Sequence, residues 1–244
     1  MRRNLAANLE PVTVALDAWR APPLPGPLTL VGRYARLEPL GPEHAAALHA
    51  ANAASDAKWA YLPYGPFATA ADYVAWVAGV AGRADPRFFA VRDLAAAAPG
   101  GVASLMRATP EHGVIEVGHI CFAPALQRTR AATEAVLLLA DWAFATGYRR
   151  FEWKCDAANA PSRRAAARYG FACEGVFRQH MIVKGRNRDT AGFAMIDRDW
   201  PELRAAHRAW TDPSNFDADG RQWRRLAELN AAVRLRAEGE RARP

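Results

Sequence analysis

The stretch that decides the fold is PALQRTRAATEAVLLLADWAF, which runs from Pro124 to Phe144. It begins as a polar turn with two arginines and continues as a long apolar helix. The first backbone N–H groups of a helix have no partner inside the helix, and together with the helix dipole they attract anions. Small residues at Ala131 and Ala132 let a ligand approach the backbone, which is typical of a pyrophosphate site. Taken by itself, the stretch fits an ordinary buried helix with a solvated basic turn at least as well.

The apolar part of this helix predicts that it packs against a sheet. One face consists of small and branched apolar residues, namely Ala132, Val136, Leu139, Ala140 and Ala143. Strand patterns flank the helix on both sides, over residues 113–122 and 150–156, and Gly147 predicts the end of the helix. The stretch therefore joins two neighbouring strands of an α/β domain.

The rest of the chain alternates strand and helix patterns in one order. That order is strand, two helices, three strands, helix, strand, helix and two strands. The strands are expected at 28–40, 87–93, 101–109, 113–122, 150–156, 175–183 and 188–197, and the helices at 42–52, 69–82, 130–147 and 160–169. The sequence thus predicts a mixed α/β domain over 28–199.

Two further segments lie outside this domain. Residues 1–27 end in APPLPGP, and these prolines predict either an arm on the surface or a disordered leader. Residues 200–244 predict a helical extension. Trp200, Leu203, His207 and Trp210 recur there at helical spacing, and a second amphipathic helix is expected from about Arg221. Covering the sheet edge, forming a homodimer and lying over a binding groove all stay open as roles for this extension.

Composition narrows the class of protein. With 244 residues, 51% of them hydrophobic, the chain can bury one substantial core. No run of about 18 residues is free of charges or turn formers, so no membrane span is expected. The N-terminus does not read as a signal peptide, because Glu10, Pro11 and Asp17 interrupt it. We therefore expect a soluble, cytoplasmic protein.

The three cysteines, Cys121, Cys155 and Cys173, are odd in number and have no close-paired spacing. This pattern favours reduced thiols over disulfides or a zinc site, so no metal is expected.

The formal net charge of +7 raises the question of a nucleic-acid partner. Such a partner calls for a dense basic stripe with interleaved aromatic residues. The nearest candidates are RQHMIVKGRNRD (178–189), which predicts a hairpin turn, and RLRAEGERARP (234–244), which predicts a frayed helix end. The charge therefore does not favour nucleic acid, although it would help to attract a phosphorylated ligand.

At QRTRAA (127–132) the chain resembles the acyl-CoA signature of the GNAT N-acetyltransferase superfamily, Gln/Arg-x-x-Gly-x-Gly/Ala. Arg130 stands at the usual glycine position, where its side chain would either narrow the phosphate site or supply a charge-assisted contact. DAANAPSRRAAARYGF (156–171), the hairpin at 174–190 and the opening strand and helix at 32–52 are also similar to the family, so the resemblance covers about 28–199. The branch it resembles most contains the RimJ/RimL-type ribosomal-protein N-terminal acetyltransferases.

The resemblance implies acetyl-CoA as co-substrate and a GNAT fold, with a mixed, mostly antiparallel central sheet flanked by helices. In this family the strand before the phosphate loop is splayed from its neighbour, and its backbone pairs with the pantetheine arm. The residues that correspond to cofactor contacts are Ile120, Cys121 and Phe122 for pantetheine, Gln127, Arg128, Thr129, Arg130, Ala131, Ala132 and Thr133 for the pyrophosphate, and Asn159 and Ser162 for the pantetheine or phosphate side. Asn159 is explained equally well as a helix cap ahead of Pro161.

The resemblance also implies direct transfer of the acetyl group to an amine, without a metal or an acyl-enzyme. Glu116 aligns with the glutamate that serves as general base in the histone-acetylating branch. His119 lies on the same strand and could share or replace that role, since an imidazole titrates near pH 6.5. The alternatives are an exposed strand carboxylate for Glu116 and a core or edge histidine for His119. Glu152 and Asp156 are weaker candidates, because with Lys154 they fit a charged sheet face.

Other roles stay open at this level. Many GNAT enzymes carry a tyrosine as proton donor where this chain has Ala166, and Tyr169 is expected to pack in the core instead. The acceptor could be a protein N-terminus, a polyamine, an aminoglycoside or an amino acid. The alternative function is a non-catalytic acyl-CoA-binding regulatory module.

Overall fold

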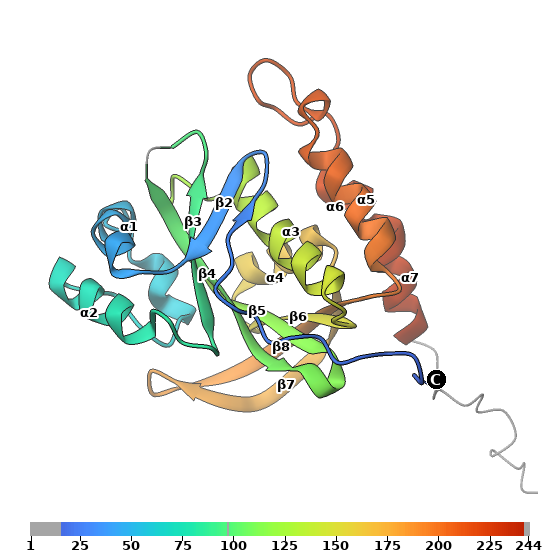
Figure 1. The fold of residues 1–244 in the computed structure, drawn as a ribbon, viewed down its shortest axis with the longest axis horizontal. Helices are drawn as coiled ribbons and strands as arrows, with labels where there is room; N and C mark the ends of the chain where they lie inside the picture. The colour runs from blue at the N-terminus through green and yellow to red at the C-terminus, as the bar shows by residue number, and fades with distance from the viewer. Residues whose placement is uncertain (1–15, 97, 242–244) are drawn as a thin grey trace, which may run out of the picture.

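The computed structural model describes residues 16–96 and 98–241 (Figure 1). Its centre is an eight-stranded sheet in the order β1-β2-β3-β4-β5-β6-β8-β7. Every neighbouring pair is antiparallel except β5 and β6, which are parallel. The strands are β1 Leu30–Val31, β2 Ala35–Pro39, β3 Arg87–Asp93, β4 Pro99–Thr109, β5 Val114–Phe122, β6 Arg150–Asp156, β7 Ala172–Val183 and β8 Arg186–Ile196. The expected mixed, mostly antiparallel sheet is confirmed.

Helices cover both faces of this sheet (Figure 1). One side carries α1 Ala45–Asn52 and α2 Ala70–Val80, while the other carries α3 Arg130–Ala145, α4 Ala160–Tyr169, α5 Trp200–Thr211, α6 Leu226–Leu229 and α7 Ala231–Arg241. Short 3₁₀ turns lie at Pro42–His44, Ala57–Tyr61, Pro110–His112 and Pro213–Asn215. In the part of the chain that is described, no helix combines the length and the apolar character needed to span a membrane.

Two apolar cores follow from this layering. The larger lies between the sheet and α3, α4 and α5, where the small residues of α3 let the helix approach the strands closely, as the sequence predicts. The smaller lies between the other face of the sheet and α1 and α2, and it contains Trp59, Tyr73 and Phe88. The candidate site lies between β5 and β6, in the part of the sheet where these two strands no longer pair.

The strand expected over residues 28–40 is in fact two strands. β1 pairs antiparallel with β2, with Leu30 opposite Leu37, and a turn joins them. The carboxylate of Glu134, in the first turns of α3, accepts hydrogen bonds from the backbone N–H groups of Arg33, Tyr34 and Ala35. The single-strand prediction was wrong because a distant side chain, which the local pattern does not show, satisfies the backbone of this turn.

The second helix of the extension begins later than predicted. Residues 217–225 form a loop, and α6 begins at Leu226 rather than near Arg221. The backbone N–H of Arg221 is bonded to the carboxylate of Asp217, and that of Arg224 to the side-chain oxygen of Asn215. These side-chain acceptors hold the segment in a turn, which competes with helix formation.

The segment before the domain lies on the surface where it is described. No helix or strand occurs between residues 16 and 29. The indole of Trp19 donates to the carbonyl of Gly147, and the hydroxyl of Tyr148 donates to the carbonyl of Pro23. Residues 16–27 therefore form a surface arm, while the expectation for residues 1–15 lies outside the described part.

Candidate active site

The strands β5 and β6 pair along only the first part of their length, and we call the stretch beyond, where they no longer pair, the slot. They pair only from Val114 to Val117 on β5, which face Arg150 to Trp153 on β6. From Gly118 to Phe122 the backbone of β5 has a strand neighbour only on the β4 side. A slot with an unpaired strand edge can accept an extended ligand as an additional strand.

A β-bulge in β5 lies directly after the last pair with β6. Between the pairs Ser104–Gly118 and Val102–Cys121, β5 holds one residue more than β4. His119 lies in this bulge with φ of 51°, in the left-handed region that residues other than glycine adopt uncommonly. Beyond the bulge, Ile120, Cys121 and Phe122 have no partner in β6, and these are the residues for which the resemblance implies contacts with pantetheine.

The loop after β5 leads directly to the N-terminus of α3. Thr129 caps the helix, because its hydroxyl accepts a hydrogen bond from the N–H of Ala132 (3.0 Å) and donates one to the carbonyl of Leu126 (2.8 Å). Arg128 adopts φ of 64°. Among the described residues, no protein acceptor takes the N–H groups of Arg128, Arg130 and Ala131. These three donors at the positive end of a helix could hold a phosphate group.

The side chain of Gln127 binds the end of β5. Its amide nitrogen donates to the carbonyl of Phe122 (2.8 Å), the last residue of β5. This contact ties the phosphate loop to the end of the strand.

Arg130 does not fill the turn with its side chain. The guanidinium lies over the ring of Tyr34 at 5.3 Å and over the ring of Phe216, in the extension, at 4.2 Å. Stacking against aromatic faces is a favourable arrangement for this planar cation. The backbone N–H at the usual glycine position therefore stays available although the residue is not glycine.

Asn159 and Ser162, at the start of α4, both have partners within the protein. The side-chain oxygen of Asn159 accepts a hydrogen bond from the N–H of Ser162 (3.1 Å), so the helix-cap interpretation is confirmed. The Ser162 hydroxyl accepts from the indole of Trp153 (3.0 Å). Their contacts with a cofactor stay a prediction.

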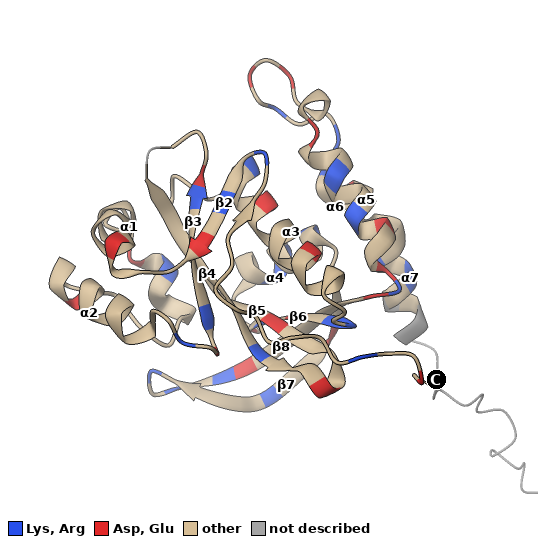
Figure 2. Ribbon diagram, in the orientation of Figure 1, with Lys and Arg blue, Asp and Glu red and all other residues tan. Residues whose placement is uncertain are grey.

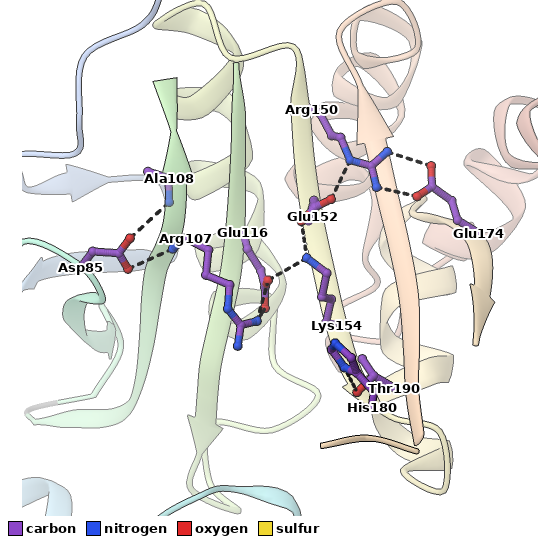
Figure 3. Close-up of polar contacts among 10 residues, drawn as sticks. All are labelled: Asp85, Arg107, Ala108, Glu116, Arg150, Glu152, Lys154, Glu174, His180 and Thr190. Atoms are coloured by element: carbon purple, nitrogen blue, oxygen red, sulfur yellow. Dashed lines mark hydrogen bonds and ion pairs between the residues drawn. The ribbon is translucent and has the colours of Figure 1, made fainter. Parts of the chain in front are cut away.

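Glu116 is buried between two cations (Figure 3). Its side chain is 3% exposed, so its interpretation as an exposed strand carboxylate was wrong. Nη1 of Arg107, from β4, lies 3.1 and 3.0 Å from the two carboxylate oxygens, and Nζ of Lys154, from β6, lies 3.1 Å from Oε2. A buried carboxylate needs such partners, because an unpaired buried charge is costly.

His119 lies on the side of the smaller core. Its ring packs against Tyr64, with ring centroids 5.5 Å apart, and against Phe88 at 4.9 Å. Burial lowers the pKa of His119 to about 4, and the positive charge of Arg107 acts in the same direction. The imidazole is therefore uncharged at neutral pH and has a free lone pair.

Glu152 and Glu174 form a charged face of the sheet together with Arg150 and Lys154. Lys154 also binds Glu152, while Arg150 links Glu152 at 2.7 Å to Glu174 at 2.8 Å (Figure 3). The side-chain oxygen of Asp156 accepts the N–H of Ala158 in the turn that precedes α4. The structural interpretation of Glu152 is thus confirmed.

Opposite charges lie side by side on the sheet and on the C-terminal helices (Figure 2). The basic stretch 178–189 forms the expected hairpin, with its turn between Val183 and Arg186.

Lys184 is a site residue that sequence reasoning missed. From the turn between β7 and β8, its ammonium group donates to the carbonyl oxygens of Trp59 (2.9 Å), Tyr64 (3.1 Å) and Gly65 (2.6 Å). It holds the loop before α2 against the hairpin and so places Tyr64 beside His119. No spacing in the sequence indicates this contact, because the partners are far apart in the chain.

Replacing Lys184 with methionine is expected to loosen the 59–65 loop. Three carbonyl groups lose a charged donor, so amide hydrogens of this loop should exchange with solvent about tenfold faster. Hydrogen-exchange mass spectrometry would measure the change. Arg186→Met is the matched control, since Arg186 is an exposed cation of the same hairpin. Equal exchange in parent and Lys184→Met protein would show that the ammonium does not hold the loop.

The chain is thus an α/β protein in which an unpaired strand edge leads into the N-terminus of a helix, with buried polar groups beside it. Residues 35–172 match the acetyltransferase (GNAT) domain family, and the chain belongs to this family.

Solved structures agree with that assignment. A GCN5-related N-acetyltransferase from Brucella melitensis is 45% identical with a TM-score of 0.87, over 88% of this chain and 100% of the other. A probable acetyltransferase of the GNAT family from Chromobacterium violaceum is 41% identical with a TM-score of 0.74, over 80% and 100%. The ribosomal L7/L12 acetyltransferase RimL, at 20% identity with a TM-score of 0.59 over 69% and 94%, shares the fold alone. No curated protein matches the chain.

Proposed function

We propose that this protein is an acetyl-CoA-dependent N-acetyltransferase that moves an acetyl group directly to a primary amine. The observation that carries the proposal is the continuity of the site: the unpaired edge of β5 runs into a loop and a helix N-terminus with three free N–H donors. Acetyl-CoA would supply the activated thioester. Its long arm and its diphosphate match the slot and the helix end in that order.

The protein's own groups would bind the co-substrate in two ways. The backbone of Ile120 to Phe122 would pair with the amide groups of the pantetheine arm, as another strand would. The N–H groups of Arg128, Arg130 and Ala131 would donate to the pyrophosphate. Both contacts use backbone, which explains why Arg130 can replace the usual glycine.

We assign the proton transfer to His119. When the amine nitrogen attacks the thioester carbonyl, it becomes positively charged and strongly acidic, so even a weak base can take its proton. The uncharged imidazole is suited to this role. Glu116, whose two oxygens already accept hydrogen bonds from Arg107 and Lys154, would hold these cations in place. The carbon–sulfur bond then breaks, and the thiolate takes a proton from solvent.

Direct transfer, rather than an acyl-cysteine, is supported by the thiols near the slot. Burial raises the pKa of Cys121 to about 12, and it also raises the pKa of Cys155. Both groups are therefore protonated at neutral pH and are poor nucleophiles. Tyr169 is buried against Trp153, in agreement with its expected packing role, so it does not replace the tyrosine missing at Ala166.

The acceptor amine is proposed only as a class, either a protein N-terminus or a small molecule. The resemblance to RimJ/RimL-type enzymes favours a protein α-amine weakly, because proteins of one fold can differ in substrate. We place the reaction in the cytoplasm, because the pattern of the three cysteines favours reduced thiols.

Calorimetric titration of the full chain with acetyl-CoA tests the proposal, followed by a screen of peptide N-termini, polyamines, aminoglycosides and amino acids. The expected result is saturable binding with one acetyl-CoA per chain and acetylation of at least one amine class. Binding with no acetylation would support the acyl-CoA-binding module instead. An absence of binding would contradict both functions.

A further inference from the structure

The C-terminal extension reaches the phosphate end of the candidate cofactor site. Phe216 contacts Arg130 in the first turn of α3. Trp210 on α5 contacts Arg168 of α4, which in turn donates to Thr133 of that first turn. The hydroxyl of Tyr34, next to that turn, donates to the carbonyl of Thr211 at 3.0 Å. The extension is therefore part of the surroundings of this helix end rather than a separate appendage.

Each aromatic residue holds one arginine. The guanidinium of Arg130 lies 4.2 Å from the ring centre of Phe216, and that of Arg168, on α4, lies 4.8 Å from the ring centre of Trp210. Nη1 of Arg168 also donates to the hydroxyl of Thr133 at 3.1 Å. Two cations thus flank the first turn of α3, one from the helix itself and one from its neighbour.

The aromatic residues are themselves held firmly. The rings of Trp210 and Phe216 meet edge to face at 5.3 Å. The indole of Trp210 donates to the side chain of Gln222 (2.7 Å), and the amide nitrogen of Asn215 donates to the carbonyl of Trp210 (3.2 Å). The loop of the extension is a preorganised support for the two cations.

No carboxylate of the described residues forms an ion pair with either Arg130 or Arg168, although most other buried charges of the site are paired. Burial lowers the pKa of Arg168, because removal from water disfavours the charged form. A helix N-terminus carries partial positive charge and disfavours nearby cations. Two unpaired cations at this end therefore indicate an anion as the missing partner.

We propose that Arg130 and Arg168 bind the phosphate groups of acetyl-CoA and that Trp210 and Phe216 of the C-terminal extension position them. This inference rests on the proposed function, since it concerns the same site. It gives the extension a role in cofactor affinity and makes Phe216 a positioning residue.

The first test measures binding of acetyl-CoA by calorimetry to the full-length parent and to Arg168→Gln and Arg130→Gln. Each variant removes one charge-assisted contact, so Kd should rise about tenfold or more. The control Arg164→Gln removes an exposed cation from the same helix as Arg168 and should change Kd less than twofold. Thermal unfolding confirms that each variant folds, and if Arg168→Gln does not, Arg130→Gln carries the test.

The second test separates positioning from general loss of structure. Phe216→Leu keeps both charges but removes the ring face, so KM for acetyl-CoA should rise several-fold with unchanged kcat. With acetyl-pantetheine, which has no diphosphate, kcat/KM should equal that of the parent. A fall with both substrates would show a merely structural role and overturn the proposal. If the parent binds acetyl-CoA and all variants bind equally well, this inference fails while the proposed function stands. If the parent does not bind, the proposed function itself fails.

Discussion

Replacing His119 with asparagine is expected to lower kcat for amine acetylation by about 10²–10⁴-fold, the range that a general base contributes. Asparagine tolerates the left-handed backbone of the bulge, so the slot between β5 and β6 should persist. Affinity for acetyl-CoA should therefore stay within about twofold of the parent. Steady-state kinetics together with calorimetry would separate the two effects.

The pH dependence gives an independent check on the same residue. With its pKa lowered to about 4, His119 stays unprotonated from pH 8 down to pH 5. In that window kcat/KM should fall only with the neutral fraction of the acceptor amine, about tenfold per pH unit below the pKa of the amine. A histidine with the ordinary pKa of 6.5 would add a second tenfold loss per unit below that pH. The slope of the profile therefore distinguishes a buried imidazole from a solvated one.

Two further variants define what would contradict the assignment. His112→Asn changes an exposed histidine and should leave kcat unaltered. Glu116→Gln tests the competing base. If it abolishes turnover while His119→Asn keeps kcat within about threefold, the carboxylate and not the imidazole accepts the proton.

Much of the fold follows from local patterns in the sequence. The order of strands and helices can be predicted from the periodicity of the apolar residues. Gly147 and Gly170 indicate where α3 and α4 end. Both ends need a residue that tolerates positive φ, which glycine provides. The start of α3 is equally local, because Thr129 caps it within one turn. For these reasons the loop that leads into α3 could be located from its residues.

The features that depend on distant contacts could not be predicted. The position of His119 in a left-handed bulge has only a weak signal in the residue type, because histidine is enriched in that conformation but most histidines do not adopt it. The burial of Glu116 depends on Arg107 and Lys154, which come from two other strands. The stacking of Arg130 on Phe216 joins the phosphate loop to the extension, and neither segment indicates the other.

Removing the carboxylate of Glu134 is expected to lower the free energy of unfolding by about 3 kcal/mol. The side chain is 6% exposed and accepts three backbone hydrogen bonds, from Arg33 at 3.0 Å, Tyr34 at 2.6 Å and Ala35 at 2.8 Å. In Glu134→Ala these donors lose their acceptor, and each buried unsatisfied group costs about 1–3 kcal/mol, less where water can reach it. Urea denaturation with an unchanged m-value would measure the loss.

The contact between Glu134 and the turn can also be disturbed by a substitution in the turn itself. A Cβ at Gly32 would lie 2.3 Å from a carboxylate oxygen of Glu134, so Gly32→Ala should displace the carboxylate and destabilise the fold as well. Because both changes disrupt one contact, the double variant should lose clearly less than the sum of the single losses. Glu111→Ala, at an exposed acid of the Pro110–His112 turn, is the control and should change stability by less than about 0.5 kcal/mol. Additive losses would show that Glu134 and the turn act independently. In that case the carboxylate would not be what folds the turn against α3, and the position of Tyr34 beneath Arg130 would need another cause.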